Sequence, residues 1–200
     1  MNEKDFHFSI ALQPKQKEAM RMLENDGKTG VVGYGGSRGG GKSFLVRAWM
    51  LLRRLAYPGT KGVIIRKTYP ELLTNHIMTL WQEYPRLREY YNKSEKCLEF
   101  PNELGGGALF FRQLENDDDV YKFVGQEFDD IALDEATQHT ELTFKLLRAS
   151  NRTSSLSKIR PKMLLTFNPG GIGSGWVKRL FIDKMFLDNE RAEDYGFVQA

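Results

Sequence analysis

The chain has 200 residues, 40% of them hydrophobic and 28% charged, with a formal net charge of +3; this is the composition of a globular domain, and its small positive charge permits contact with nucleic acid without indicating it. We expect neither a membrane span, because no apolar run is long enough, nor a signal peptide, because the N-terminal stretch is charged and has no long apolar block. The single cysteine, Cys97, excludes an internal disulfide and a cysteine-based zinc site, which favours a reducing, intracellular setting.

Short apolar strands alternate with longer amphipathic segments, which predicts an α/β fold with a mainly parallel central sheet flanked by helices. The last residues, 195–200, are typical of a strand that is just beginning, so we expect the chain to be part of a longer one. In chain order, the pattern predicts a strand at 30–36, a helix at 42–57, a strand at 61–68, a helix at 70–84, a hairpin or paired edge strands at 97–114, a short amphipathic piece at 118–126, a strand ending in acids at 128–136, a helix at 141–150, a strand at 162–169 and a helix at 174–183.

A glycine-rich loop joins the first predicted strand to the first predicted helix. It reads GSRGGGKS and fits the pattern G-x-x-x-x-G-K-[ST] of a phosphate-binding loop. Glycines let successive backbone N–H groups turn inward around an anion, and the start of the helix adds the positive end of its dipole. We expect Lys42 to reach the β- and γ-phosphates of a nucleotide and the Ser43 hydroxyl to bind Mg²⁺. The predicted phosphate cradle consists of Gly36, Ser37, Arg38, Gly39, Gly40, Gly41, Lys42 and Ser43.

Two acids, Asp134 and Glu135, follow a buried strand further along the chain. The carboxyl edge of the sheet is where ligands of open α/β folds bind. We expect Asp134 to hold Mg²⁺ through water and Glu135 to orient and deprotonate an attacking water, which indicates hydrolysis. Acids in the first turn of a helix give the same pattern without a site, but the phosphate-binding loop upstream argues against that alternative.

A further buried strand ends in the polar residues Thr166 and Asn168. In an ATPase sheet, polar groups at this place lie beside the γ-phosphate and can respond to its presence. A plain transition from strand to turn at Asn168 and Pro169 explains the same letters equally well. The histidines His7, His76 and His139 lack metal-ligand spacing, so we interpret them as surface or packing residues.

These pieces, in this order, resemble one family over roughly residues 9–200: the large terminase subunit of tailed bacteriophages, in its N-terminal ATPase domain. The generic part of the resemblance is the Walker A loop, with Arg38 inside it, and the Walker B strand FDDIALDEA. The more specific part is RKTYPELL, after the second predicted strand, and FNPGG with GWVKRLF, which are similar to the family's coupling motif and the helix beyond it. Near the start, LQPKQKEAM resembles the adenine-side element, with Gln16 rather than Gln13 as the nucleotide contact.

The resemblance implies a P-loop NTPase of the RecA or ASCE type that hydrolyses ATP with Mg²⁺, with Glu135, Arg38, Lys42 and Asn168 as catalytic residues. Such subunits drive double-stranded DNA into the procapsid as a homo-oligomeric ring, commonly of five, on the portal protein and with the small terminase subunit. They act in the host cytoplasm and are not part of the mature virion, and an isolated domain can be monomeric. We expect residues 1–200 to be a single ATPase domain that lacks the family's C-terminal nuclease domain and does not cut DNA.

The transition-state arginine and the DNA contacts are the open points. Arg38 is the candidate for an arginine finger within the same subunit. Lys122 lacks the planar fork that the role needs. For a finger that reaches a neighbouring subunit, the remaining candidates are Arg112, Arg148 and Arg152. Basic residues that could contact DNA phosphates are Arg53, Arg54, Arg66 and Lys67, whereas the acidic run 117–119 is typical of a solvated turn.

Other readings of the phosphate-binding loop belong to different classes of protein. A P-loop kinase would pass phosphate to a metabolite, but it has no need of Glu135 as a base for water. A helicase-like motor should have a second RecA-like domain, and the chain contains no second phosphate-binding loop. A non-catalytic nucleotide-binding module would bind ATP without turning it over.

Overall fold

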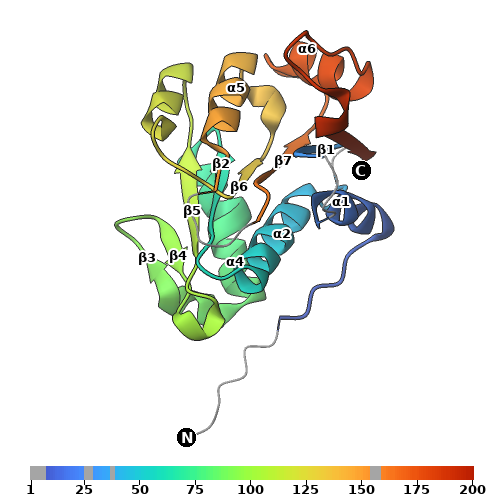
Figure 1. Cartoon of the computed structure of the whole chain (residues 1–200). Helices are drawn as coiled ribbons and strands as arrows, with labels where there is room; N and C mark the ends of the chain where they lie inside the picture. Colours follow the sequence, from blue (N-terminus) through green and yellow to red (C-terminus); the bar gives the residue numbers. More distant parts are fainter. Residues whose placement is uncertain (1–7, 25–28, 37–38, 154–158) are drawn as a thin grey trace, which may run out of the picture.

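One sheet separates two layers of helices (Figure 1). The structure is a computed structural model, and it describes residues 8–24, 29–36, 39–153 and 159–200. The strand order is β3-β4-β5-β2-β6-β7-β1-β8. The strands from β5 to β8 in this order are all parallel, and only the β3-β4-β5 edge is antiparallel. The predicted α/β fold and the predicted paired edge strands are therefore confirmed. The strands are β1 (Val31–Gly35), β2 (Lys61–Arg66), β3 (Tyr91–Asn92), β4 (Cys97–Glu99), β5 (Ala108–Gln113), β6 (Asp130–Leu133), β7 (Lys162–Phe167) and β8 (Tyr195–Gln199).

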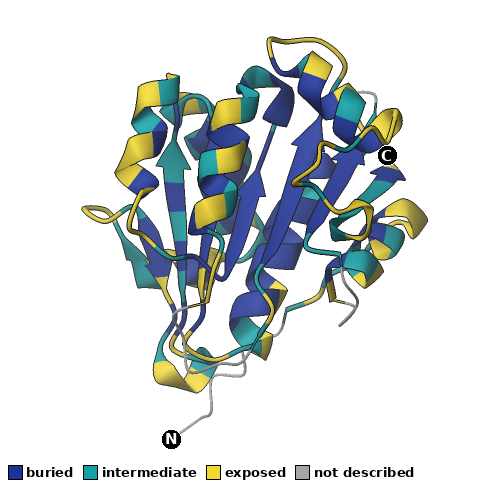
Figure 2. Ribbon diagram, turned by 45° about the horizontal axis from the view of Figure 1, so that its top comes forward, coloured by how far each residue is buried: buried dark blue, intermediate teal, exposed yellow. Residues whose placement is uncertain are grey.

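Helices cover both faces of the sheet because its central strands are apolar on both sides. In β6, for example, Ala132 packs in one core, whereas Ile131 and Leu133 pack in the other. Figure 2 shows these strands as a buried layer between helices whose exposed residues face outward. The α-helices are α1 (Pro14–Glu24), α2 (Lys42–Ala56), α3 (Tyr69–Leu72), α4 (Met78–Glu83), α5 (Glu141–Ser150) and α6 (Ser174–Val177).

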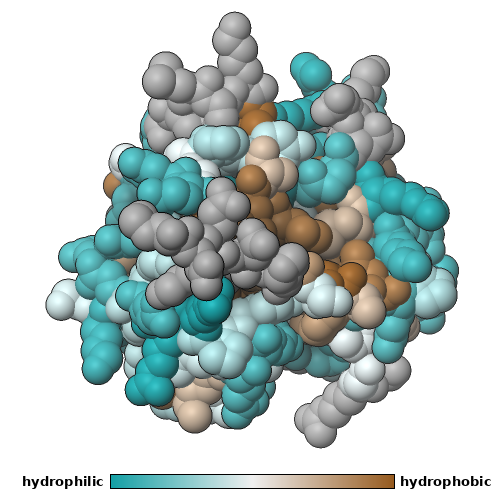
Figure 3. Space-filling model, turned by 90° about the horizontal axis from the view of Figure 1, so that it is seen from below, coloured by the Kyte–Doolittle hydropathy of each residue, from teal (hydrophilic) through white to brown (hydrophobic). Residues whose placement is uncertain are grey.

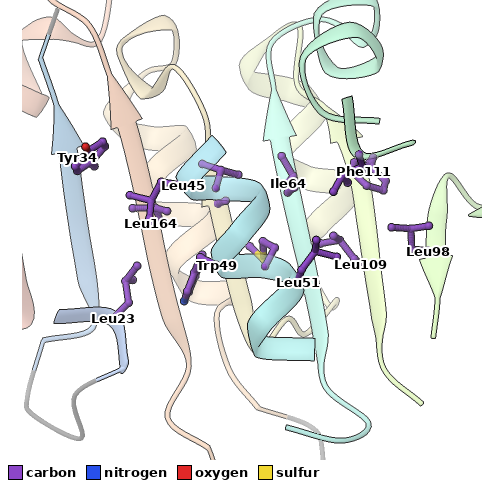
Figure 4. Packing of buried hydrophobic residues seen from close by; sticks show 14 of the residues in the cluster. Leu23, Tyr34, Leu45, Trp49, Leu51, Ile64, Leu98, Leu109, Phe111 and Leu164 are labelled. Carbon is purple, nitrogen blue, oxygen red and sulfur yellow. The ribbon is translucent and has the colours of Figure 1, made fainter. Parts of the chain in front are cut away.

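The first core lies under α1, α2 and α4, and the second under α5 and α6. Helix α2 presents its apolar stripe to β7, β2 and β5, as the predicted helical spacing requires. Figure 3 shows that apolar residues gather near the middle and right of the face seen from below, among hydrophilic side chains. No helix in the described part of the chain is long and apolar enough to cross a bilayer. Figure 4 labels residues of the first core: Leu45, Trp49 and Leu51 of α2 with Ile64, Leu109, Phe111 and Leu164 of the sheet.

The helix predicted at 70–84 is interrupted by a π-helical turn, η1 (Leu73–Ile77), between α3 and α4. The helix predicted at 174–183 likewise changes from α6 to a π-helical turn, η6 (Lys178–Ile182). A π turn fits one more residue into the turn and so changes which side chains face the sheet, and such turns are frequent at functional sites. The short 3₁₀ helices are η2 (Pro85–Tyr90), η3 (Asn102–Leu104), η4 (Asp117–Phe123), η5 (Ala136–Gln138) and η7 (Ala192–Asp194).

Two polar segments differ from their interpretation in the sequence. The acidic run 117–119 opens η4, where Asp119 takes part in the capping box with Asn116. Asp117 accepts hydrogen bonds from the hydroxyls of Thr140 and Thr143, both at 2.8 Å, so the run is tied to the start of α5 and is not a solvated turn. Arg53 and Arg54, considered above as DNA contacts, are buried and paired with the carboxylate of Asp130. Neither arginine is therefore available to a DNA phosphate.

Candidate active site

The strand order brings three predicted site segments to one edge of the sheet. β7 lies between β6 and β1, so the loop after β1, the acids after β6 and the asparagine after β7 leave the sheet at the same carboxyl edge. A cleft of about 350 Å³ opens there. Its lining joins the phosphate-binding loop to the acid pair and to the helices after β2: Gly39, Gly40, Gly41, Lys42, Ser43, Phe44, Arg47, Asn75, Thr79, Glu135 and Asn168.

Two side chains from other elements hold the phosphate-binding loop. The Gln16 amide donates to the carbonyl oxygen of Gly41 at 3.0 Å and accepts from the backbone N–H of Gln13 at 2.8 Å. The hydroxyl of Tyr34 donates to the carbonyl of Gly40 at 3.2 Å. Gly41 has a φ of 65°, and a Cβ there would lie 2.4 Å from the Gln16 amide nitrogen. The sequence predicts Gln16 as a nucleotide contact, and the structure places it, 2% exposed, against the loop itself.

Arg47, which the sequence analysis did not single out, ties α2 to the helices after β2. Its guanidinium donates to both carboxylate oxygens of Glu83, at 3.0 and 2.6 Å, and to the carbonyl of Asn75 at 2.7 Å. A paired, forked contact of this kind fixes geometry as well as charge. The helix that carries Lys42 and the segment η1–α4 therefore share one wall of the cleft.

Asp134 is 1% exposed and is surrounded by donors. Its Oδ2 accepts from Nε2 of His76 at 2.8 Å and from the Ser43 hydroxyl at 3.2 Å, and the Thr166 hydroxyl donates to Oδ1. Arg66 lies 3.5 Å from Oδ2. Burial alone would raise the pKa of Asp134, but the hydrogen bond from His76 and the charge of Arg66 outweigh it, so the pKa is lowered and the carboxylate is ionised.

The pair formed by Ser43 and Asp134 suits Mg²⁺. A hydroxyl and an ionised carboxylate are hard oxygen ligands, and Mg²⁺ in nucleotide sites typically takes one or two carboxylates together with substrate phosphates and water. Within the described residues, no group of three or more histidine, cysteine or acidic side chains could hold a metal without such a substrate. The donor set therefore fits a metal that arrives with a nucleotide.

Glu135 is held in a strained backbone conformation. Its φ of 59° and ψ of 51° are left-handed, which is unusual for a residue other than glycine. The Asn168 amide donates to both carboxylate oxygens, at 2.9 and 3.0 Å, and the backbone N–H of Glu135 donates to the Thr166 hydroxyl at 3.2 Å. The tip of β7 thus fixes the Glu135 carboxylate at the wall of the cleft, with Arg66 4.0 Å away.

The structure brings most of the predicted site residues together, and it adds Arg47, His76 and Arg66, whose contacts the sequence did not reveal. Ser37 and Arg38 lie outside the described residues. His76 was interpreted as a surface or packing residue; it is fully buried, and its Nε2 is hydrogen-bonded to Asp134, a contact that the sequence did not predict. Arg66, considered as a DNA contact, lies instead beside Asp134 and Glu135. The sequence signals for Arg66 are its position at the end of a strand and its place at the start of the RKTYPELL segment.

The three candidates for a finger in a neighbouring subunit have partners on the surface of their own chain. Arg112 donates to the carbonyl of Glu95 at 2.8 Å. Arg148 donates to Asp194 at 3.1 Å, and Arg152 lies 3.4 Å from Glu127.

The chain has the site of a P-loop NTPase domain of the ASCE type. It combines a glycine-rich phosphate-binding loop with an acid pair two strands away in the sheet and an asparagine that follows the strand between them. The chain belongs to the phage terminase large subunit family, whose model matches residues 29–199. No curated protein is similar enough in sequence to add a second line of evidence.

Solved structures agree with this family in their fold. The large terminase of a thermophilic bacteriophage is 14% identical with a TM-score of 0.67, over 95% of this chain and 46% of that one. The large terminase ATPase domain of Thermus phage P74-26 is 18% identical with a TM-score of 0.62, over 95% and 81% of the two chains. The N-terminal domain of the DNA packaging ATPase from bacteriophage phi29 is 14% identical with a TM-score of 0.55, over 94% and 95%. This chain spans about half the length of the thermophilic bacteriophage protein.

Proposed function

We propose that this chain is the ATP-hydrolysing domain of a motor that drives double-stranded viral DNA into a procapsid. The observation that carries the proposal is the shared cleft, which is lined by Lys42 and Ser43 of the phosphate-binding loop and by Glu135 and Asn168. Membership of the terminase large subunit family supports the proposal. Complexes of the thermophilic bacteriophage large terminase with ADP and with ATP-gamma-S give ATP as the nucleotide.

In the proposed reaction, the loop N–H groups and Lys42 bind the triphosphate and balance its charge. Glu135 accepts a proton from the attacking water, and Asn168 fixes the direction in which its carboxylate points. Bound through Ser43 and Asp134, Mg²⁺ would neutralise charge on the β- and γ-phosphates. Arg38 is the proposed transition-state arginine, and Gln16 is proposed to contact the adenine side of the nucleotide while it holds the loop.

The finer assignments follow the family. We propose double-stranded DNA, the portal protein and the small terminase subunit as partners, and a homo-oligomeric ring of five subunits in the host cytoplasm as the working form. Residues 1–200 are proposed to be one ATPase domain without nuclease activity. DNA contact through phosphates rather than bases predicts a steep loss of affinity with rising salt.

The test is ATP hydrolysis by the protein with and without double-stranded DNA, in the presence of Mg²⁺. We expect DNA to stimulate hydrolysis and Lys42→Ala to weaken ATP binding by roughly 10- to 100-fold, because a hydrogen bond to a charged group contributes about 1.5–3 kcal/mol. Lys145→Ala, on the exposed side of α5, is the matched control and should bind ATP normally.

Three results would contradict the proposal. Unchanged ATP affinity in Lys42→Ala would remove the phosphate cradle. Stimulation by a small metabolite instead of DNA would favour a P-loop kinase. ATP binding without turnover under every condition would favour a non-catalytic module.

A further inference from the structure

Resting on the proposed function, we infer that His76 is a positioning residue that sets the orientation of Asp134 and thereby the strength with which the site holds a metal–nucleotide complex. His76 comes from the π-helical turn η1, which belongs neither to the phosphate-binding loop nor to the acid-bearing strand. Its Nε2 is 2.8 Å from Oδ2 of Asp134, and both side chains are buried, at 0% and 1% exposure.

The direction of this hydrogen bond follows from the chemistry of its partners. Asp134 is ionised, so it can only accept, and Nε2 of His76 must carry the hydrogen. Nδ1 of His76 is buried without a hydrogen-bond partner, which agrees with a ring whose one N–H points at Asp134.

His76 and Thr166 together fix the plane of the carboxylate. Thr166 donates to Oδ1 and His76 to Oδ2, so each oxygen has one donor from outside the loop. The Ser43 hydroxyl also donates to Oδ2, at 3.2 Å. The lone pair of Oδ2 that His76 does not use therefore faces the phosphate-binding loop. A metal bound between Ser43 and Asp134 would use this same side.

His76 also keeps a competing cation at a distance. Arg66 is 3.5 Å from the same Oδ2, within ion-pair distance but without a hydrogen bond to it, while His76 occupies the nearer position at 2.8 Å. Without the His76 donor, the Arg66 guanidinium is the nearest group that can satisfy Oδ2. A guanidinium bound to Asp134 would compete with Mg²⁺ for the carboxylate, so the loss of His76 weakens metal binding in two ways.

The experiment measures the dissociation constant of ATPγS twice, in EDTA and at saturating Mg²⁺, and takes the ratio as the metal-linked gain in affinity. His76→Gln keeps an N–H donor at similar reach, and His76→Met has the same length without a donor. We expect His76→Met to lower the gain about tenfold, as losses of partners of metal ligands do, and His76→Gln to stay within about threefold of wild type. Affinity in EDTA should be unchanged in both. Electron paramagnetic resonance of Mn²⁺ bound with ATPγS should rank wild type, His76→Gln and His76→Met in the same order of metal affinity.

Leu80→Ala is the control for packing, because Leu80 is fully buried in α4 of the same helical segment and has no part in the site. It should lower stability and leave the metal-linked gain unchanged. If His76→Met does not fold, as loss of ATPγS binding in EDTA would reveal, His76→Asn replaces it, since that amide is too short to reach Oδ2.

The inference would be overturned if His76→Met kept the metal-linked gain in affinity of wild type, or if that gain fell equally in His76→Gln and His76→Met. Either result would leave the proposed function standing. If wild type binds no ATPγS with or without metal, the proposed function itself fails, and the inference fails with it.

Discussion

At the scale of single residues, the site depends on side chains that hold other side chains. Asn168 fixes the Glu135 carboxylate, Thr166 and His76 fix that of Asp134, and Gln16 fixes the loop at Gly41. Each of these contacts restricts a group that the proposed reaction needs in one orientation, which is the arrangement expected of a preorganised site.

The second buried histidine, His139, predicts how stability depends on pH. Burial lowers its pKa from 6.5 to about 4, so the folded protein keeps the ring neutral where the unfolded chain already binds a proton. This contribution to stability is complete above pH 6.5 and is lost as the pH falls toward 4. Between pH 7 and pH 5, the unfolding free energy of wild type should fall by about 2 kcal/mol more than that of His139→Gln, as measured by urea denaturation. An identical loss in wild type and variant would show that His139 is not kept neutral by the fold.

The sequence predicted the residues of the motifs but not His76, which orients one of them. Lys42, Ser43, Asp134, Glu135 and Asn168 could be predicted because their chemistry needs fixed residue types at strand ends. His76 lies 58 residues from Asp134 in the chain, and it reaches the site only through a π turn that no local pattern revealed. Contacts of this range depend on the packing of whole elements.

At the scale of elements, a buried ion cluster joins the end of α2 to the start of β6. Arg53 donates to both oxygens of Asp130, at 3.0 to 3.2 Å, and Arg54 donates to the same carboxylate from a fully buried position. The cluster lies at the amino end of β6, whereas the acid pair lies beyond its carboxyl end. One carboxylate therefore balances two buried cations away from the site.

Asp130→Asn should destabilise the protein by about 3–5 kcal/mol, because it removes the buried carboxylate that Arg53 and Arg54 share and leaves the fully buried Arg54 without its ion-pair partner. Glu24→Gln is the matched control, since Glu24 reaches Arg53 at 3.3 Å from a side chain that is 35% exposed, and it should cost less than about 1 kcal/mol. Urea denaturation measures both. An Asp130→Asn protein as stable as the control would contradict the proposed role of the cluster.

The elements were predicted unevenly, for physical reasons. The strands other than β3, together with α2, have strong apolar periodicity and were predicted within a few residues of their observed ends; the two-residue β3 was not predicted. Helix α1 was not predicted, because it buries only Gln16, Ala19 and Leu23 and so presents a weak apolar stripe. The breaks at η1 and η6 were not predicted, because an extra residue in a helical turn does not change the composition of the segment.

At the scale of the whole molecule, the strand order determines which motifs lie next to one another, and the motifs alone do not predict this. Alternating strands and helices predict a parallel sheet, but they do not say which strands are neighbours. The observed order sets β7 between β1 and β6, so Asn168 follows the strand between the phosphate-binding loop and the acid pair, and it lines the same cleft as both. The central claim, that the loop and the acids act on one triphosphate, rests on this order.

Single-turnover hydrolysis of Mg²⁺–ATP by Glu135→Gln, with ATP affinity measured in parallel, tests that claim most directly. The account predicts affinity within about threefold of wild type and a hydrolysis rate lower by about 10²- to 10⁴-fold, the contribution typical of a general base. The exposed Glu103→Gln should match wild type in both measurements. Hydrolysis at the wild-type rate in Glu135→Gln, with ATP bound normally, would contradict it.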